Sequence, residues 1–226
     1  MTSNLVKERL IVFTRYPEPG KTKTRLIPAL GAKGAANLQR QMTEHTMVRT
    51  REIKRLRFLS VEVYFSGGNP ELMRHWLGWD ITYQPQCAGD LGERMASAFQ
   101  VSFAAGMTEV VIIGTDCPDL NASIMTQAFE MLKEKDLVLG PSQDGGYYLI
   151  GLRRLVPELF KGIHWSTAEV LQQTARIAQK LELAVAYLSV LNDVDCPEDL
   201  WVWNSDGFYR SSVTLGKEKS QPTDES

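Results

Sequence analysis

Short apolar segments rich in β-branched residues alternate along the chain with longer segments in which apolar residues recur every three or four positions. The short segments are typical of buried strands, and the longer ones are typical of helices that pack on a sheet. This alternation predicts parallel strands joined by crossover helices. The predicted strands cover residues 10–14, 60–65, 81–84, 110–114, 137–140, 147–152 and 184–190.

Helices are predicted between these strands from apolar stripes or from a lack of proline and a wealth of helix formers. They cover residues 32–52, 91–99, 124–132 and 170–181. Ser166 precedes Glu169 by three positions, the pattern of a capping box, so the last helix is expected to begin near Ser166. Asp90 is expected to cap the helix over residues 91–99. The predicted fold class is α/β, with three layers: a mostly parallel central sheet and helices on both faces.

Composition supports one domain and a small-molecule substrate. The chain has 226 residues, of which 43% are hydrophobic and 23% are charged, enough for one substantial core. Residues 1–210 are predicted to form a single domain, and the polar residues 211–226 a disordered tail. A formal net charge of -2 provides no basic field to hold nucleic acid or an anionic membrane.

The sequence also predicts the cellular compartment of the protein. The apolar run from Leu10 to Phe13 is too short for a signal peptide or a membrane span. The cysteines are widely spaced, form no CxxC pair and have no histidine neighbours, which indicates reduced thiols and no structural zinc. A cytoplasmic protein without a membrane span is therefore expected.

A basic loop follows the first predicted strand. Two prolines and a glycine within residues 17–20 favour a turn, and Lys21, Lys23 and Arg25 then bring three cations together. Cations beside free backbone amides are typical of a phosphate-binding loop. The letters GKT resemble the end of a Walker A motif, but that motif requires a glycine where this chain has Arg15. The loop is a phosphate site of another kind, or an exposed basic loop without a ligand.

Aspartates follow two of the predicted strands. Asp116 comes just after the strand over residues 110–114 and is expected at the carboxyl edge of the sheet, where open α/β folds bind ligands. Asp193 and Asp195 lie two positions apart, so on an extended segment both side chains share a face. Carboxylate oxygens suit Mg²⁺ or Mn²⁺, which complete their shells with phosphate and water. The structural alternatives are a turn at Asp116 and a cap for a helix beginning near Pro197.

Further candidates lie in a predicted turn and on a predicted helix. Asp144 is followed by Gly145 and Gly146, which favour a turn and let a ligand approach the backbone closely. Asp144 is a candidate general base or a ligand of a substrate hydroxyl, and an ordinary hairpin turn explains the same residues. Arg94 lies off the apolar stripe of its helix, so it faces either ligand or solvent.

A set of ordered segments resembles a family of small bacterial GT-A-like transferases, which are usually described as glycosyltransferases. The segments are FTRYPEPGKTKTRLIPALG, QCAGDLGERM, GTDCPDL, GPSQDGGYYLIGL, IHWST and DVDCPEDL. The family is similar in turn to nucleotidyltransferases such as the guanylyltransferases of phospholactate and of molybdenum cofactor. The resemblance covers about residues 10–200 and implies a GT-A fold of the nucleotide-diphospho-sugar transferase type.

The resemblance also implies roles for single residues. It implies a metal at Asp116, with Asp193 and Asp195 as further ligands, and an anion site at Ser166 beside a helix amino terminus. Two wider motifs are absent: a basic loop replaces the LxGGxSxRMG loop of sugar nucleotidyltransferases, and Asp-Cys-Pro-Asp from Asp116 replaces a DxD. The residues expected to bind nucleotide, by resemblance or by their place in the loop and helix, are Arg15, Gly20, Lys21, Lys23, Thr24, Arg25 and Arg94.

These features predict a transferase that uses Mg²⁺ or Mn²⁺ and binds a nucleotide or nucleotide sugar. Glycosyl transfer to an acceptor that the sequence does not identify would use Asp144 as the base beside a metal at Asp116. Nucleotidyl transfer from a nucleoside triphosphate to a phosphorylated small molecule is the alternative, and it relies chiefly on metal and cations. A nucleotide-binding module without catalysis is a third possibility. The sequence leaves the base, the acceptor and the oligomeric state open.

Overall fold

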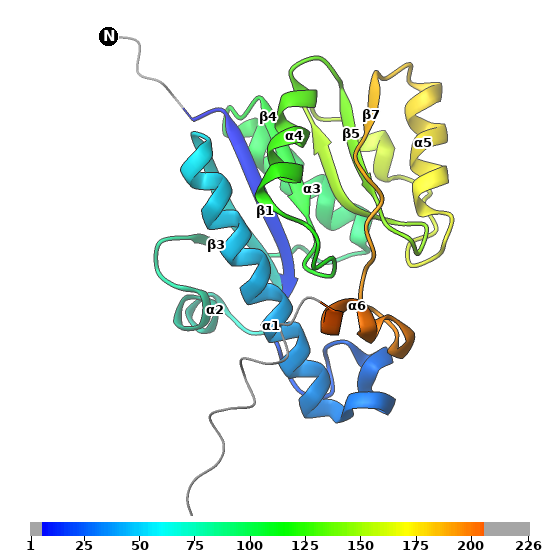
Figure 1. Ribbon diagram of the computed structural model, residues 1–226. Helices are drawn as coiled ribbons and strands as arrows, with labels where there is room; N and C mark the ends of the chain where they lie inside the picture. The colour runs from blue at the N-terminus through cyan, green and yellow to red at the C-terminus, as the bar shows by residue number, and fades with distance from the viewer. Residues whose placement is uncertain (1–5, 206–226) are drawn as a thin grey trace, which may run out of the picture.

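A seven-stranded sheet lies between two layers of helices in the computed structural model, which describes residues 6–205 (Figure 1). The α/β, three-layer prediction is confirmed, and each predicted strand is present, although the last is shorter than expected. The tail predicted over residues 211–226 lies outside the described residues. The strands are β1 (Glu8–Arg15), β2 (Leu59–Ser66), β3 (Thr82–Pro85), β4 (Glu109–Ile113), β5 (Leu137–Pro141), β6 (Tyr147–Leu152) and β7 (Val185–Tyr187).

The strand order is β3-β2-β1-β4-β6-β5-β7. Strand β6 runs antiparallel to β4 and β5, and the other neighbouring pairs are parallel. The carboxyl ends of the parallel strands therefore meet at one edge of the sheet. Because β6 is reversed, its first residues lie at the same edge, beside the ends of β4 and β5.

The helices cover both faces of the sheet. Figure 1 shows α1 and α4 on its near face and α3 behind it. Helix α1 is longer than predicted and is broken at Gly31, whose φ of 70° is not helical. Among the described residues, no helix is long and apolar enough to cross a membrane. The helices are α1 (Ile27–Leu56), α2 (Pro70–Leu77), α3 (Leu91–Ala104), α4 (Ala122–Leu132), α5 (Val170–Lys180) and α6 (Leu200–Ser205).

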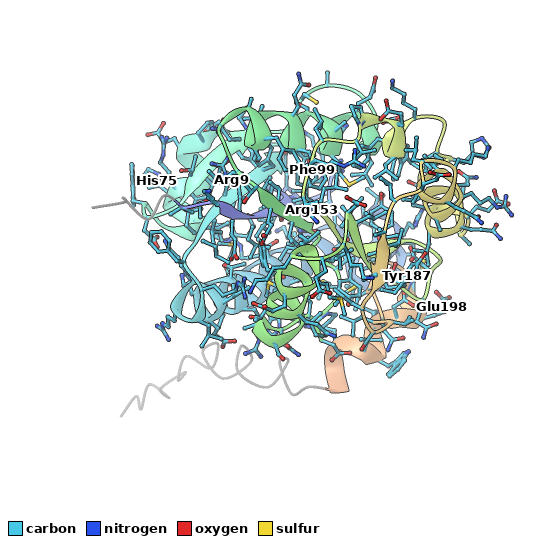
Figure 2. All side chains as sticks on the ribbon, turned by 90° about the horizontal axis from the view of Figure 1, so that it is seen from above. Arg9, His75, Phe99, Arg153, Tyr187 and Glu198 are labelled. Atoms are coloured by element: carbon cyan, nitrogen blue, oxygen red, sulfur yellow. The ribbon has the colours of Figure 1, made fainter. Side chains whose placement is uncertain are left out.

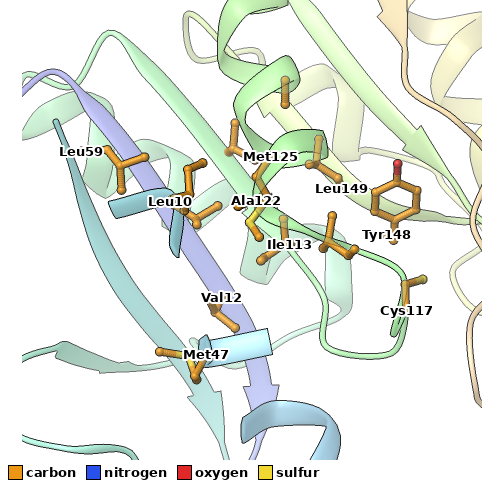
Figure 3. Close-up of a cluster of buried hydrophobic side chains, with 14 of the residues drawn as sticks. Leu10, Val12, Met47, Leu59, Ile113, Cys117, Ala122, Met125, Tyr148 and Leu149 are labelled. Carbon is orange, nitrogen blue, oxygen red and sulfur yellow. The ribbon is translucent and has the colours of Figure 1, made fainter. Parts of the chain in front are cut away.

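Alternate residues of the strands pack into two separate apolar clusters. Leu10 and Val12 of β1 face the cluster that includes α1 and α4, whereas Ile11 faces the cluster that includes α3 and α5. The first cluster extends from Leu10 to Cys117 and Tyr148, near the ends of the strands (Figure 3). The carboxyl edge of the sheet thus rests on closely packed side chains.

The predicted start of the last amphipathic helix is wrong. Helix α5 begins at Val170, its N-cap is Glu169, and no side chain caps it. Ser166 lies before the helix with a left-handed φ of 64°, because the intervening residues form turns. The other predicted cap is confirmed: Asp90 accepts a hydrogen bond from the Glu93 N–H, and the Glu93 carboxylate accepts one from the Asp90 N–H.

Phe99 of α3 is fully buried, and Figure 2 shows it inside the molecule when seen from above. We expect Phe99→Ala to lower the free energy of unfolding by roughly 3–5 kcal/mol, because it removes buried apolar contacts and leaves a cavity. Urea unfolding followed by circular dichroism measures the change. Val101→Ala on the exposed side of the same helix is the control and should change stability by less than about 0.5 kcal/mol. Equal losses in both variants would contradict the packing described.

Candidate functional site

Two cavities adjoin at the carboxyl edge of the sheet. The first has a volume of about 360 Å³ and lies over the ends of β1 and β4. The second has a volume of about 400 Å³ and lies between the β5–β6 turn, residues 165–168 and the segment after β7. Asp116 and Asp195 line both cavities, so their carboxylates mark the junction.

The deep wall of the first cavity is polar but uncharged. The Gln39 Nε2 donates hydrogen bonds to the hydroxyl oxygens of Thr14 and Thr115, each over 3.3 Å. The Gln86 Nε2 donates to the Tyr64 carbonyl over 3.0 Å, which fixes this amide at the rim. Apolar side chains such as Met95 complete the lining. A cavity of this size with a few fixed polar groups is suited to a small organic ligand.

These polar residues are not among the sites predicted from the sequence. The signal was present in α1, where Gln39, Thr43, Thr46 and Thr50 all lie on the buried side of the helix. Polar side chains on a buried stripe need partners, and here Gln39 reaches out of the helix to residues of two strand ends. Polar residues on the buried side of a helix are therefore the sequence signal for this wall.

Backbone hydrogen bonds bring the predicted acidic residues to the second cavity. The Val194 N–H donates to the Asp116 carbonyl over 2.9 Å, and the Gln143 N–H donates to the Leu191 carbonyl over 3.0 Å. Val194 is fully buried, while Asp193 and Asp195 on either side of it both line the cavity. The predicted alternation along this extended segment is thus confirmed.

Other side chains take the capping roles that were the alternatives for the acidic residues. The Asp199 carboxylate accepts hydrogen bonds from the Asp195 and Cys196 N–H groups at the turn before α6. The Asn121 side chain caps α4. The side chains of Asp116, Asp193 and Asp195 therefore remain directed to the cavities rather than to a helix terminus.

Lys23 and Arg25 of the basic loop approach these carboxylates. The Lys23 Nζ lies 2.7 Å from Asp116 Oδ1 and 4.0 Å from Asp195 Oδ1, and its side chain is only 3% exposed. The same ammonium donates to the Val194 carbonyl over 2.6 Å. Arg25, which is largely exposed, places a guanidinium nitrogen 2.5 Å from Asp195 Oδ2. Both cations thus bind carboxylates in this structure.

Asp144 has a turn role and also lines the second cavity. Its Oδ1 accepts hydrogen bonds from the Ser142 hydroxyl over 2.5 Å and from the Gly146 N–H over 2.8 Å. Gly145 has a φ of 87°, and a Cβ atom there would lie 2.2 Å from the Ala168 carbonyl oxygen. Only glycine lets this turn pack against residues 165–168, so Gly145 is required by the turn itself.

The remaining candidates from the basic loop lie at different depths. Arg15 lines the first cavity and donates to the Ser66 hydroxyl and the Lys21 carbonyl. Lys21 pairs with Glu18 over 2.7 Å and is mostly exposed. Gly20 and Thr24 are exposed and line neither of the two cavities.

Arg94 and Ser166 have indirect or partial roles. Arg94 lines neither cavity, but it donates to the Gly89 carbonyl and to Gln86 Oε1, so it supports the amide at the rim of the first cavity. Ser166 lines the second cavity, together with Gly146. It does so from a turn and not from a helix amino terminus, because α5 begins at Val170.

The donor set at the junction suits a hard cation, although no complete metal cage is assembled. Within residues 6–205, no group of three or more His, Cys, Asp or Glu side chains is arranged to hold a metal ion. Mg²⁺ needs only one or two carboxylates when phosphate and water supply its other ligands. The oxygen ligands of Asp116 and Asp195 at the junction therefore fit a metal that arrives with a phosphate-bearing ligand.

The electrostatics of the second cavity favour a cation. Burial and, to a smaller extent, the negative charge of Asp144 raise the pKa of Asp193 to about 6, with lesser contributions from Asp199 and Asp116. A backbone hydrogen bond of Asp193 itself acts in the opposite direction. The ionised form of Asp193 is thus disfavoured by its burial and by its acidic neighbours.

The fold is of the nucleotide-diphospho-sugar transferase type. The chain belongs to the family described as "Uncharacterized protein conserved in bacteria (DUF2064)", whose model matches residues 49–167. It is 35% identical to a Desulfovibrio desulfuricans G20 protein provisionally described as a nucleotide-diphospho-sugar transferase. That match covers 92% of each chain, with a TM-score of 0.84. No curated protein sequence matches the chain.

More distant structures share the fold alone. One is a 4-diphosphocytidyl-2C-methyl-D-erythritol synthase from Anaerococcus prevotii DSM 20548, with 6% identity, a TM-score of 0.60 and coverage of 91% of this chain and 99% of that one. Another is a CMP:2-keto-3-deoxy-manno-octonic acid synthetase in complex with CTP. It has 10% identity, a TM-score of 0.56 and coverage of 90% and 99%.

The raised pKa of Asp193 predicts a pH-dependent effect on stability. In the unfolded chain this carboxyl titrates near its ordinary pKa of 3.8, whereas folding raises the pKa to about 6. Its ionisation therefore opposes folding increasingly as the pH rises from 4 through 6. With EDTA present, we expect Asp193→Asn to raise the melting temperature at pH 7.5 by about 2–4 °C. That shift corresponds to about 1 kcal/mol, a value reduced because the group is half exposed.

Differential scanning calorimetry at pH 7.5 and pH 4 tests this expectation. At pH 4 the variant should differ little from the unsubstituted protein, since Asp193 is then mostly protonated in the folded state. The same stabilisation at both pH values would show that the substitution acts through packing and not through charge.

Proposed function

We propose that the protein is a transferase dependent on Mg²⁺ or Mn²⁺, which binds a nucleotide sugar and transfers its sugar to an acceptor. The nucleoside part is assigned to the first cavity and the acceptor to the second. The observation that carries this proposal is the position of Asp116 and Asp195, which line both cavities. Groups at such a junction are within reach of ligands in both cavities, and holding two reactants side by side lowers the barrier to transfer between them.

Individual residues are assigned roles in this reaction. Asp116 and Asp195 would hold the metal, which would supply a positive charge to the diphosphate of the donor. Arg25 and Lys23 would add positive charge on the side of the basic loop. Asp144 would take the proton of the acceptor hydroxyl on Oδ2, because the hydrogen bonds of the turn both end on Oδ1.

Similarity to the D. desulfuricans protein supports the broad class of this proposal. At 35% identity over 92% of both chains, the two proteins belong to one family, and that protein is described as a nucleotide-diphospho-sugar transferase. The distant synthetases contribute only the observation that this fold can hold nucleotides, as the CTP complex illustrates for that protein.

Nucleotidyl transfer is the second candidate, and the cations at the junction favour it. Phosphoryl chemistry needs mainly positioning and neutralisation of charge, which a metal, Lys23 and Arg25 could supply without a protein base. The hydrogen bonds of Asp144 to Ser142 and Gly146 would then serve only the turn. The two reactions differ in what they require of the Asp144 carboxylate.

Asp144→Asn separates the two reactions. For glycosyl transfer, we expect kcat to fall by about 10²- to 10⁴-fold with little change in donor affinity, because the base acts on the acceptor. For nucleotidyl transfer, the variant should keep most of its turnover. Product analysis decides independently: a nucleoside diphosphate from a nucleotide sugar indicates glycosyl transfer, and pyrophosphate from a triphosphate indicates nucleotidyl transfer. Neither product across a panel of donors with Mn²⁺ would favour a binding module without catalysis.

Asp116→Asn tests the metal-dependent binding on which both reactions depend. We expect the affinity for a nucleotide sugar in the presence of Mn²⁺ to fall at least about tenfold, or about 1.4 kcal/mol, and EDTA to have the same effect on the unsubstituted protein. Isothermal titration calorimetry measures both. Asp119→Asn, an exposed aspartate in the same loop, is the matched control and should bind as before. Unchanged affinity in Asp116→Asn would remove Asp116 from the site.

A further inference from the structure

The sequence makes Lys23 a candidate phosphate ligand, but in the structure its ammonium contacts groups of the protein itself. Its Nζ contacts Asp116 Oδ1 at 2.7 Å and the Val194 carbonyl at 2.6 Å, and lies 4.0 Å from Asp195 Oδ1. Only 3% of the Lys23 side chain is exposed, whereas the side chain of Lys21 in the same loop is mostly exposed. An ammonium that is removed from water in this way must be held by such partners.

The backbone holds Lys23 in this position. The φ of Lys23, 47°, lies in the left-handed region, which residues other than glycine rarely adopt. Lys23 comes just before the short helical turn Thr24–Leu26. The Leu26 N–H donates to the Lys23 carbonyl over 2.9 Å, and Leu26 is fully buried. The ammonium is therefore placed at the carboxylates by the fold of the loop and not by a flexible side chain on the surface.

The charges around the second cavity do not balance. Asp116, Asp144, Asp193 and Asp195 line it with four carboxylates. Lys23 and Arg25, which pair with Asp116 and Asp195, supply two positive charges. The excess of two negative charges equals the charge of one divalent cation, but the oxygen atoms nearest the junction already share the ammonium of Lys23.

We propose that Lys23 is an internal counter-cation that keeps the metal site weak until a nucleotide binds, so that metal and nucleotide bind cooperatively. This inference rests on the proposed function, because it concerns the same metal and the same ligand. A divalent cation at Asp116 and Asp195 would lie close to the ammonium and be repelled by it. The phosphates of a nucleotide bring negative charge to both cations and remove that repulsion. Lys23 is thus a positioning residue, which acts on the metal through Asp116.

Mn²⁺ binding to Lys23→Met tests the proposal directly. Methionine keeps an unbranched stem of similar length and removes the charge, so Asp116, Asp195 and the Val194 carbonyl become available to the metal. Without nucleotide, we expect Lys23→Met to bind Mn²⁺ at least tenfold more tightly than the unsubstituted protein. Free Mn²⁺ is measured by electron paramagnetic resonance during a titration. An affinity no greater than that of the unsubstituted protein would overturn the proposal.

The coupling between ligands is the second measurement. Repeating the Mn²⁺ titration with each of the four common nucleoside diphosphates should tighten Mn²⁺ binding at least tenfold in the unsubstituted protein, for at least one nucleotide. In Lys23→Met the same nucleotide should tighten it threefold or less, because the repulsion is already absent. Equal coupling in both proteins would mean that Lys23 does not mediate the coupling, which overturns the proposal.

Two further variants control for charge and folding. Lys33→Met removes an exposed lysine of α1 that lines neither cavity, and it should leave Mn²⁺ binding unchanged. Lys23→Gln removes the charge but keeps a hydrogen-bond donor for Val194, and it should match Lys23→Met. Circular dichroism checks the fold of each variant. If both Lys23 variants unfold, the unsubstituted protein decides, because less than tenfold tightening by every nucleotide overturns the proposal.

Failure of this inference and failure of the proposed function give different results. If Lys23→Met gains Mn²⁺ affinity while no nucleotide or nucleotide sugar binds the unsubstituted protein, Lys23 weakens the metal site, but the cooperativity and the transferase proposal both fail. If nucleotides bind with Mn²⁺ but Lys23→Met gains no affinity, the proposed function stands and the inference is overturned.

Discussion

The hydrogen bond from the Val194 N–H to the Asp116 carbonyl is the constraint on which the candidate site depends. It ties the segment after β7, from one side of the sheet, to the loop after β4 near its centre. To reach that loop the segment passes the ends of β5 and β6, and it continues to α6 beside the start of α1 (Figure 1). Val194 and Val202 pack there against Leu26 and Met42, so the crossing is anchored by an apolar cluster.

The two cavities differ in the physical means by which they could hold a ligand. The first relies on fixed amide and hydroxyl groups, whose hydrogen bonds to one another hold them in place before any ligand arrives. The second relies on charges that do not cancel, around Asp144 and Asp193. Fixed hydrogen-bonding groups orient a ligand and select it by its polar groups, whereas an excess of charge attracts an ion and its counter-ions. Their junction at Asp116 combines both properties.

The sequence predicted the sheet and the acidic residues because both have local signals. Strands rich in β-branched residues are visible in short windows, and an aspartate after a buried strand must lie at the sheet edge. The partners of Lys23 had no such signal, since Val194 is 171 positions away in the chain. The prediction at Ser166 failed for the opposite reason. Its capping pattern is local and easily recognised, but turns follow Ser166 and the helix begins only at Val170.

Strand β6 runs against its neighbours, and this reversal gives the two cavities unequal freedom to vary. The β5–β6 connection is a tight turn around Asp144 and Gly145, and of the two adjoining cavities it borders the second and not the first. An insertion or deletion in that turn would reshape the second cavity, whereas the polar wall of the first cavity, at Gln39, Thr14 and Thr115, lies on other elements. The topology therefore lets one short connection change the second cavity separately from the polar wall of the first.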